Sequence, residues 1–191
     1  MNRRDALSRV ALILGGTVVG ANAFLEGCTP SDKKATDVNL AFTPEDIAYL
    51  DEIAETIIPA TSTPGAKAAK VGAFMTVMVN DCYDENDQKV FKAGMKTLDE
   101  ACKKKTGKSF MDSSPEERKT LLTELDKEAK DYAASAKKGD PKHYFRMMKE
   151  LTLLGYFTSE PGATQALRYV AVPGKYEGCI DYKKGDRAWA T

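Results

Sequence analysis

One histidine and a short cluster of carboxylates are the first residues to consider for acid–base or metal chemistry. His143 is the only histidine of the chain and falls in the first turn of a predicted helix, between Lys142 and Tyr144. A catalytic base needs a partner that orients it, and the sequence suggests none. We therefore expect an exposed histidine without a catalytic role.

The carboxylates lie between two predicted helices. Asp81, Asp84, Glu85 and Asp87 place several oxygen ligands in one turn, as a hard cation requires. The turn lacks the ligand spacing and the glycine of an EF-hand loop. We expect a solvated polar turn and no metal site.

The motifs that mark cofactor-binding enzymes are missing from the sequence. It contains no Cys-x-x-Cys-His for covalent haem, no Gly-x-Gly-x-x-Gly for a dinucleotide and no phosphate-binding P-loop. Gly-x-Ser-x-Gly and His-Glu-x-x-His are also missing. We predict that the chain has no catalytic, cofactor-binding or metal-binding residues of its own.

Residues 1–27 are predicted to be an export signal. Arg3 and Arg4 precede an apolar stretch at 10–24, which resembles a twin-arginine signal. Ala21-Asn22-Ala23 offers one cleavage site, whereas Leu25-Glu26-Gly27-Cys28 resembles a lipobox in which Cys28 becomes lipidated. We favour the lipoprotein, followed by a polar linker at 28–41. Either reading places the mature chain outside the cytoplasm, in the periplasm.

Three further cysteines follow, Cys82, Cys102 and Cys179, so at most one disulfide can form among them. In a helical hairpin Cys102 would lie roughly 15–22 Å from Cys82, at about 1.5 Å per residue, which is beyond bridging distance. A bridge from Cys82 or Cys102 to Cys179 remains open, and free thiols are the alternative.

Helical periodicity dominates the rest of the chain. Two strong starts, Thr43-Pro44-Glu45-Asp46 and Ser114-Pro115-Glu116-Glu117, combine an N-cap with an acid three residues later. Apolar residues recur at helical spacing, with Leu151 and Leu154 expected to face inward on the last long helix. The expected helices are 43–59, 67–82, 87–105, 114–137 and one starting at 140. We predict an all-α, single-domain bundle over 42–191.

The loop at 60–66 is rich in threonine, serine, proline and glycine. It can cap the next helix, or its backbone N–H groups can bind an anion. We favour capping alone.

Composition excludes one class of partner. The chain has 28 basic and 28 acidic residues, a net charge of zero, and no basic run interleaved with aromatic residues. Nucleic-acid binding is therefore not expected.

The end of the chain is aromatic and irregular. A short helical piece is expected at 163–169, followed by a tail that contains Tyr169, Tyr176, Tyr182 and Trp189. So many large amphipathic side chains are unusual in a solvated terminus. We expect the tail to lie against a surface, either the helices of this chain or another protein.

Several pieces of the sequence, in this order and spacing, resemble the small subunit (subunit 3) of membrane-associated gluconate 2-dehydrogenase. They are Ala54-Glu55-Thr56-Ile57-Ile58-Pro59 with Thr63-Pro64-Gly65-Ala66, Asp81-Cys82-Tyr83 with Phe91 and Gly94, Gly155-Tyr156-Phe157-Thr158-Ser159-Glu160 with Gly162-Ala163-Thr164, and Val172-Pro173-Gly174 with Tyr176 and Cys179. The resemblance covers about 42–189.

The resemblance implies an accessory subunit without a redox centre. In that family a large FAD-dependent sugar or polyol dehydrogenase carries the catalysis, and a c-type cytochrome containing haem passes the electrons on. The small subunit accompanies the flavoprotein, and its export signal is thought to serve both. Gluconate is then the name of the family and not a substrate read from this chain.

We consider two functions, the one that the resemblance implies and a rival to it. In the first, a loop and the aromatic tail face the flavoprotein, through Pro59, Thr63, Pro64, Tyr156, Tyr169, Tyr176 and Trp189, because Tyr and Trp dominate interface energetics. The alternative is a stand-alone periplasmic lipoprotein that binds a small sugar-like ligand, with Tyr156, Tyr169 and Trp189 stacking on it.

Overall fold

Four helices of the structure begin at a residue whose side chain caps them. A computed structural model describes residues 42–137, 139–172, 174–175 and 177–190. The Thr43 hydroxyl accepts the Asp46 amide while the Asp46 carboxylate accepts the Thr43 amide, so the predicted capping box forms. Ser114 and Glu117 make the same exchange. Each box satisfies backbone donors that the first turn of a helix leaves free.

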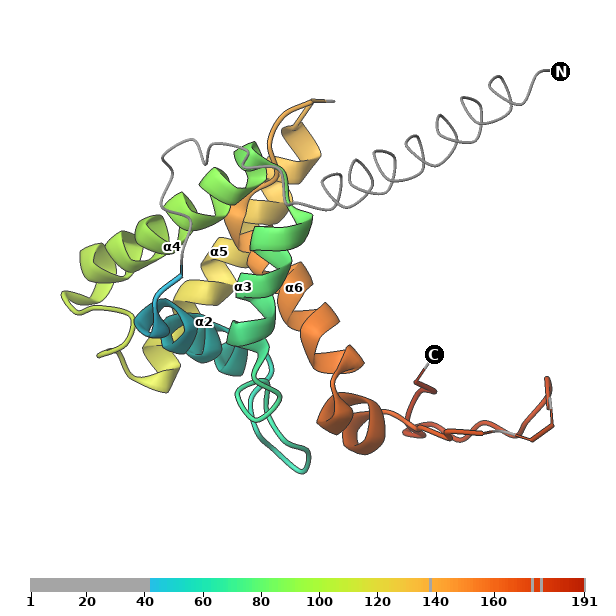
Figure 1. The fold of residues 1–191 in the computed structure, drawn as a ribbon. Helices are drawn as coiled ribbons and strands as arrows, with labels where there is room; N and C mark the ends of the chain where they lie inside the picture. Colours follow the sequence, from blue (N-terminus) through green and yellow to red (C-terminus); the bar gives the residue numbers. More distant parts are fainter. Residues whose placement is uncertain (1–41, 138, 173, 176, 191) are drawn as a thin grey trace, which may run out of the picture. The chain divides into compact units, whose positions relative to one another are not determined.

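Five α-helices make up the body of the fold (Figure 1). They are α2 (Pro44–Ile57), α3 (Val71–Cys82), α4 (Glu85–Thr106), α5 (Pro115–Ser135) and α6 (Tyr144–Thr158). Helix α6 packs against all four others, and α2 packs against both α3 and α5. The described residues contain no β-strand, so the all-α prediction is confirmed.

The core lies where these helices meet α6. Every helix contributes buried side chains to it, and those of α2, α3, α4 and α6 include fully buried ones. Burying them supplies the main driving force for the fold. The largest are Tyr156, Phe91, Phe110, Phe145, Leu50, Ile53, Met75, Leu98, Met147, Met148, Val71 and Val79. None of the helices in the described part of the chain has the length and apolar character needed to cross a membrane.

Helix α3 begins four residues later than predicted. Lys70 precedes it with a positive φ of 54°, a left-handed conformation that a helix cannot continue through. The Lys70 amide donates to the Lys67 carbonyl and the Val71 amide to the Ala66 carbonyl. Residues 67–70 therefore form turns that lead into the helix.

Helix α6 also begins later than predicted, at Tyr144. His143 is its N-cap, because its Nδ1 accepts the Phe145 amide at 3.3 Å. The imidazole stacks on the Tyr144 ring, with 4.6 Å between centroids, and its side chain is largely buried. The prediction of an exposed histidine was therefore wrong. The Tyr144 hydroxyl is half-buried, and this burial raises its pKa to about 12.

The segment after α6 starts with one turn of π-helix, η1 (Gly162–Ala166), where a short helix at 163–169 had been expected. The Leu167 amide closes the turn by donating to the Gly162 carbonyl. A Cβ on Gly162 would lie only 1.8 Å from the Tyr156 carbonyl oxygen, so η1 can fold back onto the end of α6 only with glycine here. The tail then continues beyond the end of α6 (Figure 1).

Predictions about the export signal, Arg3, Arg4, Cys28 and the linker at 28–41 concern positions outside the described residues. The same holds for Tyr176. They remain predictions.

Substitution of Gly94 tests how closely α4 packs against α6. A Cβ at this position would lie 2.3 Å from the Cβ of Tyr144. Alanine is the better helix former by up to about 1 kcal/mol, but overpacking a core costs about 1–3 kcal/mol. We therefore expect Gly94→Ala to lower the free energy of unfolding, measured by urea denaturation.

The control is the neighbouring exposed position. Ala93→Gly should lower stability by about 1 kcal/mol through helix propensity alone. A Gly94→Ala variant that is more stable than the wild type would show that the α4–α6 contact is looser than the structure indicates.

Candidate partner interface

The loop between α2 and α3 is held by one carboxylate. Glu55 accepts the Ala60 amide at 2.9 Å and the Lys67 amide at 2.8 Å, one with each oxygen. A Cβ on Gly65 would lie 2.2 Å from that carboxylate, so only glycine lets the loop pass over it. Two backbone N–H groups of this loop thus already bind an anion, and the anion belongs to the chain itself.

Two other acidic residues of α2 hold neighbouring segments. Asp51 accepts the Gly72 amide at 2.7 Å, at the start of α3. Glu52 pairs with Lys67 and, at 2.7 Å, with Arg118 of α5. The hydrogen bond from Lys67 lowers the pKa of Glu52, and the charge of Arg118 acts in the same direction.

Arg118 extends this anchoring to the connection between α4 and α5. Its Nε donates to the Phe110 carbonyl at 2.8 Å and its Nη2 to the Met111 carbonyl at 2.6 Å. Its guanidinium lies over the Phe110 ring, 5.3 Å from the centroid. The acidic residues of α2 thus hold both the α2–α3 connection and, through Arg118, the α4–α5 connection.

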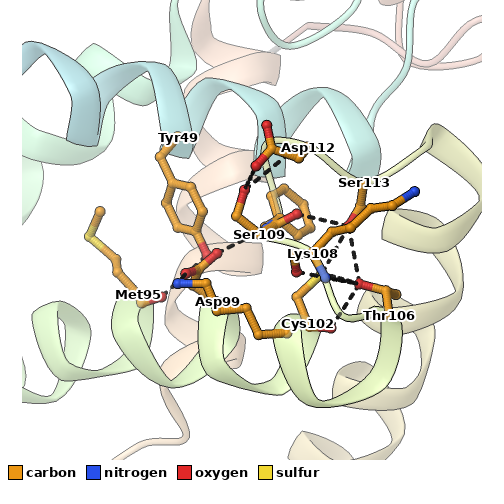
Figure 2. A network of polar contacts seen from close by, with 11 residues as sticks. Tyr49, Met95, Asp99, Cys102, Thr106, Lys108, Ser109, Asp112 and Ser113 are labelled. Carbon is orange, nitrogen blue, oxygen red and sulfur yellow. Dashed lines mark hydrogen bonds and ion pairs between the residues drawn. The ribbon is translucent and has the colours of Figure 1, made fainter.

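A second polar network ties the α4–α5 connection to α4 (Figure 2). Asp99 accepts the Phe110 amide at 2.9 Å, and the buried Cys102 sulfur lies 3.2 Å from the Ser113 hydroxyl. Tyr49 of α2 donates to the Met95 carbonyl at 3.2 Å, and burial raises its pKa far above the ordinary value. Every group in this network has a partner within the chain, so we assign it a structural role.

The predicted polar turn at 81–87 also has a structural role. Asp84 is the N-cap of α4, and its carboxylate accepts the amides of Asn86 and Asp87. Among the described residues no group of three histidine, cysteine or acidic side chains is arranged to hold a metal ion.

Tyr156 does not belong to an exposed interface, contrary to the prediction. Only 2% of it is exposed, and its hydroxyl donates to the Pro64 carbonyl at 2.6 Å. The hydrogen bond places the 59–66 loop at the end of α6 where the tail begins. Of the predicted interface residues in this loop, Pro59 is exposed and Thr63 and Pro64 are half-buried.

Burial of Tyr156 also removes one member of the predicted sugar-stacking group. Tyr169 and Trp189 are exposed, whereas Tyr156 lies in the core with its hydroxyl occupied. The three rings therefore do not form one binding surface.

Exposed apolar side chains gather towards the C-terminal end of the described chain. Leu154, predicted to face inward, is 45% exposed, because Leu151, Thr152 and Gly155 occupy the buried face of α6. Apart from Val77 and Met111, the large exposed hydrophobic residues are Leu153, Leu154, Phe157, Tyr169, Val170, Val172, Ile180, Tyr182 and Trp189. We call these nine residues the apolar end.

Seven of these residues had not been named as interface residues: Leu153, Leu154 and Phe157 on α6, and Val170, Val172, Ile180 and Tyr182 in the tail. A signal was present on α6, because Leu151, Leu153, Leu154, Tyr156 and Phe157 are more apolar residues than one helix face can bury.

The tail does not lie on the helices. From 169 to 189 all its described residues are exposed. Of the two expected surfaces, the helices of this chain are thus not the one that covers it. Uncovered apolar groups of this extent are typical of a binding surface.

All three described cysteines are free thiols, so the Cys82–Cys179 disulfide is not present in the structure. Cys82 ends α3 and is exposed, and Cys179 is exposed in the tail. Cys102 is buried in the network of Figure 2.

Substitution of Glu55 tests whether its carboxylate holds the loop between α2 and α3. In Glu55→Gln the new NH2 group would face one of the two backbone N–H groups, so one of the two hydrogen bonds is lost. A hydrogen bond of this kind contributes about 0.5–1.5 kcal/mol. We expect a loss of stability of that size in urea denaturation, with faster hydrogen exchange at the Ala60 and Lys67 amides.

Glu100→Gln is the matched control, since Glu100 lies exposed on α4. It should change stability by less than about 0.5 kcal/mol. Equal effects of the two variants would contradict the role assigned to Glu55.

Comparison with known proteins returned one informative match. A family model described as gluconate 2-dehydrogenase subunit 3 matches residues 44–174. No curated protein and no solved structure matches the chain. The family description is that of a subunit, which implies partner subunits. The match runs from the first residue of α2 into the tail, well over half of the sequence, and confirms the resemblance: the chain belongs to the gluconate 2-dehydrogenase subunit 3 family.

Proposed function

We propose that the chain is a non-catalytic accessory subunit that docks through its apolar end onto a membrane-associated, FAD-dependent sugar or polyol dehydrogenase. The observation that carries the proposal is the distribution of exposed apolar residues. Apart from Val77 and Met111, all large ones of the described chain lie between Leu153 and Trp189. A partner that covers this end would remove it from water.

The helices support this role by giving the docking end a fixed base. Glu55 holds the 59–66 loop, and Tyr156 connects that loop to the end of α6. Leu153, Leu154 and Phe157 project from the same helix. A preorganised surface of this kind binds more tightly, because less conformational freedom is lost on association.

The residues of this chain also bear on which subunit carries the catalysis. Polar side chains of the described helices serve as caps, loop anchors and ion-pair partners, and we propose that catalysis belongs to the partner. FAD is then held by the large subunit and haem by a c-type cytochrome, with no cofactor in this chain.

We further propose that the chain is exported to the periplasm. The arginine pair, the apolar stretch and Cys28 support export followed by lipid anchoring. In this arrangement the 28–41 linker would tether the helical domain, and with it the flavoprotein, to the membrane.

Removal of the tail tests the docking role. The tagged full-length chain, purified from its own host, should retain a flavin-containing subunit with dye-linked sugar or polyol dehydrogenase activity. A variant lacking residues 174–191 should retain the helical content of the wild type, seen by circular dichroism, but lose the flavoprotein.

Matched substitutions separate the apolar end from exposed apolar groups elsewhere. Leu154→Ser combined with Phe157→Ser should weaken retention of the flavoprotein, whereas Met111→Ser, in the α4–α5 connection, should not. Undiminished copurification by the tail deletion and by the double variant would overturn the proposed docking surface.

A further inference from the structure

The tail is closed into a loop by one short backbone pairing. The Arg168 amide donates to the Ala188 carbonyl at 2.8 Å, and the Ala190 amide donates to the Arg168 carbonyl at 2.9 Å. The Arg168 guanidinium lies over the Trp189 ring, 4.5 Å from the centroid, and donates to the Arg187 carbonyl at 2.9 Å. We call Arg168 and residues 187–190 the clasp.

The clasp joins the two ends of the tail. Between those ends, the polar contacts of the described residues are local: Lys175 pairs with Glu177, and Lys183 and Asp186 exchange hydrogen bonds across a turn. Such contacts shape a turn but do not determine where the two ends of the tail lie. The helices do not hold the tail either, because its described residues from 169 to 189 are exposed. Its closed path therefore depends on the clasp.

Closing the loop brings together apolar side chains that are distant in sequence. Trp189 is paired with Arg168, and Tyr169 follows Arg168 directly, so the start and the end of the tail meet in one region. Ile180 and Tyr182, from the middle of the tail, line a hollow of about 530 Å³ together with Trp189. In an open tail these side chains would not be held near one another. The tail residues of the apolar end thus form one surface only while the clasp is closed.

The clasp is held by few contacts. Trp189 is 46% exposed, and a cation–π pair or a single backbone hydrogen bond contributes little in contact with water. Closing a loop of this length costs conformational entropy, which opposes these contacts. Because the opposing contributions are of similar size, we expect an open and a closed tail to be close in free energy. A partner that binds one of the two states then shifts the population towards it.

We propose that the clasp is a conformational switch of the docking end: the flavoprotein binds the tail with the clasp closed, and opening the clasp lowers the affinity. Arg168 is a positioning residue in this scheme, because it acts by holding Trp189 and closing the loop. A closed loop loses less conformational freedom on association than an open tail does. The inference rests on the proposed function, because it describes how the apolar end is kept ready for the flavoprotein.

A reversible disulfide across the clasp separates closure from side-chain chemistry. Neighbouring extended segments lie about 5 Å apart, within the span of a disulfide, and the side chains of Arg168 and Trp189 meet on one side of the pairing. We would combine Arg168→Cys and Trp189→Cys in a full-length chain that carries Cys82→Ser and Cys179→Ser, which removes the exposed native thiols. The oxidised form should bind the copurified flavoprotein at least about tenfold more tightly than the reduced form, because oxidation closes the loop without changing any residue. The chain with the two serine substitutions alone should bind equally well with and without reductant.

Arg168→Ala tests the native contact. Deuterium should replace the Ala190 amide hydrogen faster in the free variant than in the wild type, and the affinity for the flavoprotein should fall about tenfold. Lys175→Ala is the matched control, because it removes a basic side chain of the same tail that pairs with Glu177 outside the clasp. It should change the exchange rate and the affinity by less than about twofold.

The outcomes distinguish this inference from the proposed function. If the wild-type chain retains no flavoprotein, both fail. If it does, the clasp is overturned as a switch when the disulfide cannot form, when the oxidised form binds no more tightly than the reduced form, or when Arg168→Ala binds like the wild type. A loss of affinity in Arg168→Ala without faster exchange at Ala190 also overturns it, since Arg168 would then act by contacting the partner. Each of these results leaves the accessory role intact.

Discussion

The carboxylate of Glu55 is the interaction on which the arrangement of this end of the molecule depends. It accepts two backbone amides from the two ends of the loop that follows α2, and it occupies the space that a side chain on Gly65 would need. The same loop then accepts the hydroxyl of Tyr156. One acidic side chain thereby determines where the end of α6 meets the 59–66 loop, and so where the tail leaves the helices.

The neighbouring acids of α2 act in the same way on other segments. Asp51 holds the start of α3, and Glu52 joins Lys67 to Arg118. Isolated ion pairs at a surface contribute little, but Arg118 is largely buried and also binds two carbonyls, so its contribution is geometric as well as electrostatic. These contacts hold the connections between the helices in one conformation.

The sequence predicted the parts of the fold that depend on interactions between residues close together in the chain. The Thr43 and Ser114 capping boxes start helices where expected, and apolar periodicity predicted all five. The late starts of α3 and α6 were missed because they depend on a left-handed Lys70 and on His143 serving as a cap, neither of which has a strong sequence pattern. The burial of Tyr156 and the exposure of Leu154 were missed for another reason. Both lie on one amphipathic helix, and which of its apolar residues face inward is decided by contacts with α2 and α3 that are distant in sequence.

Trp189 gives the molecule a built-in optical reporter. It is the only tryptophan of the chain, and the Arg168 guanidinium lies over its indole ring, 4.5 Å from the centroid. Tryptophan emission therefore depends on the state of this one position, because no other tryptophan contributes to it. Any event that opens the pairing with Arg168, or replaces water around the ring with protein, changes the wavelength and intensity of that emission, so the tail can be followed in real time without a label.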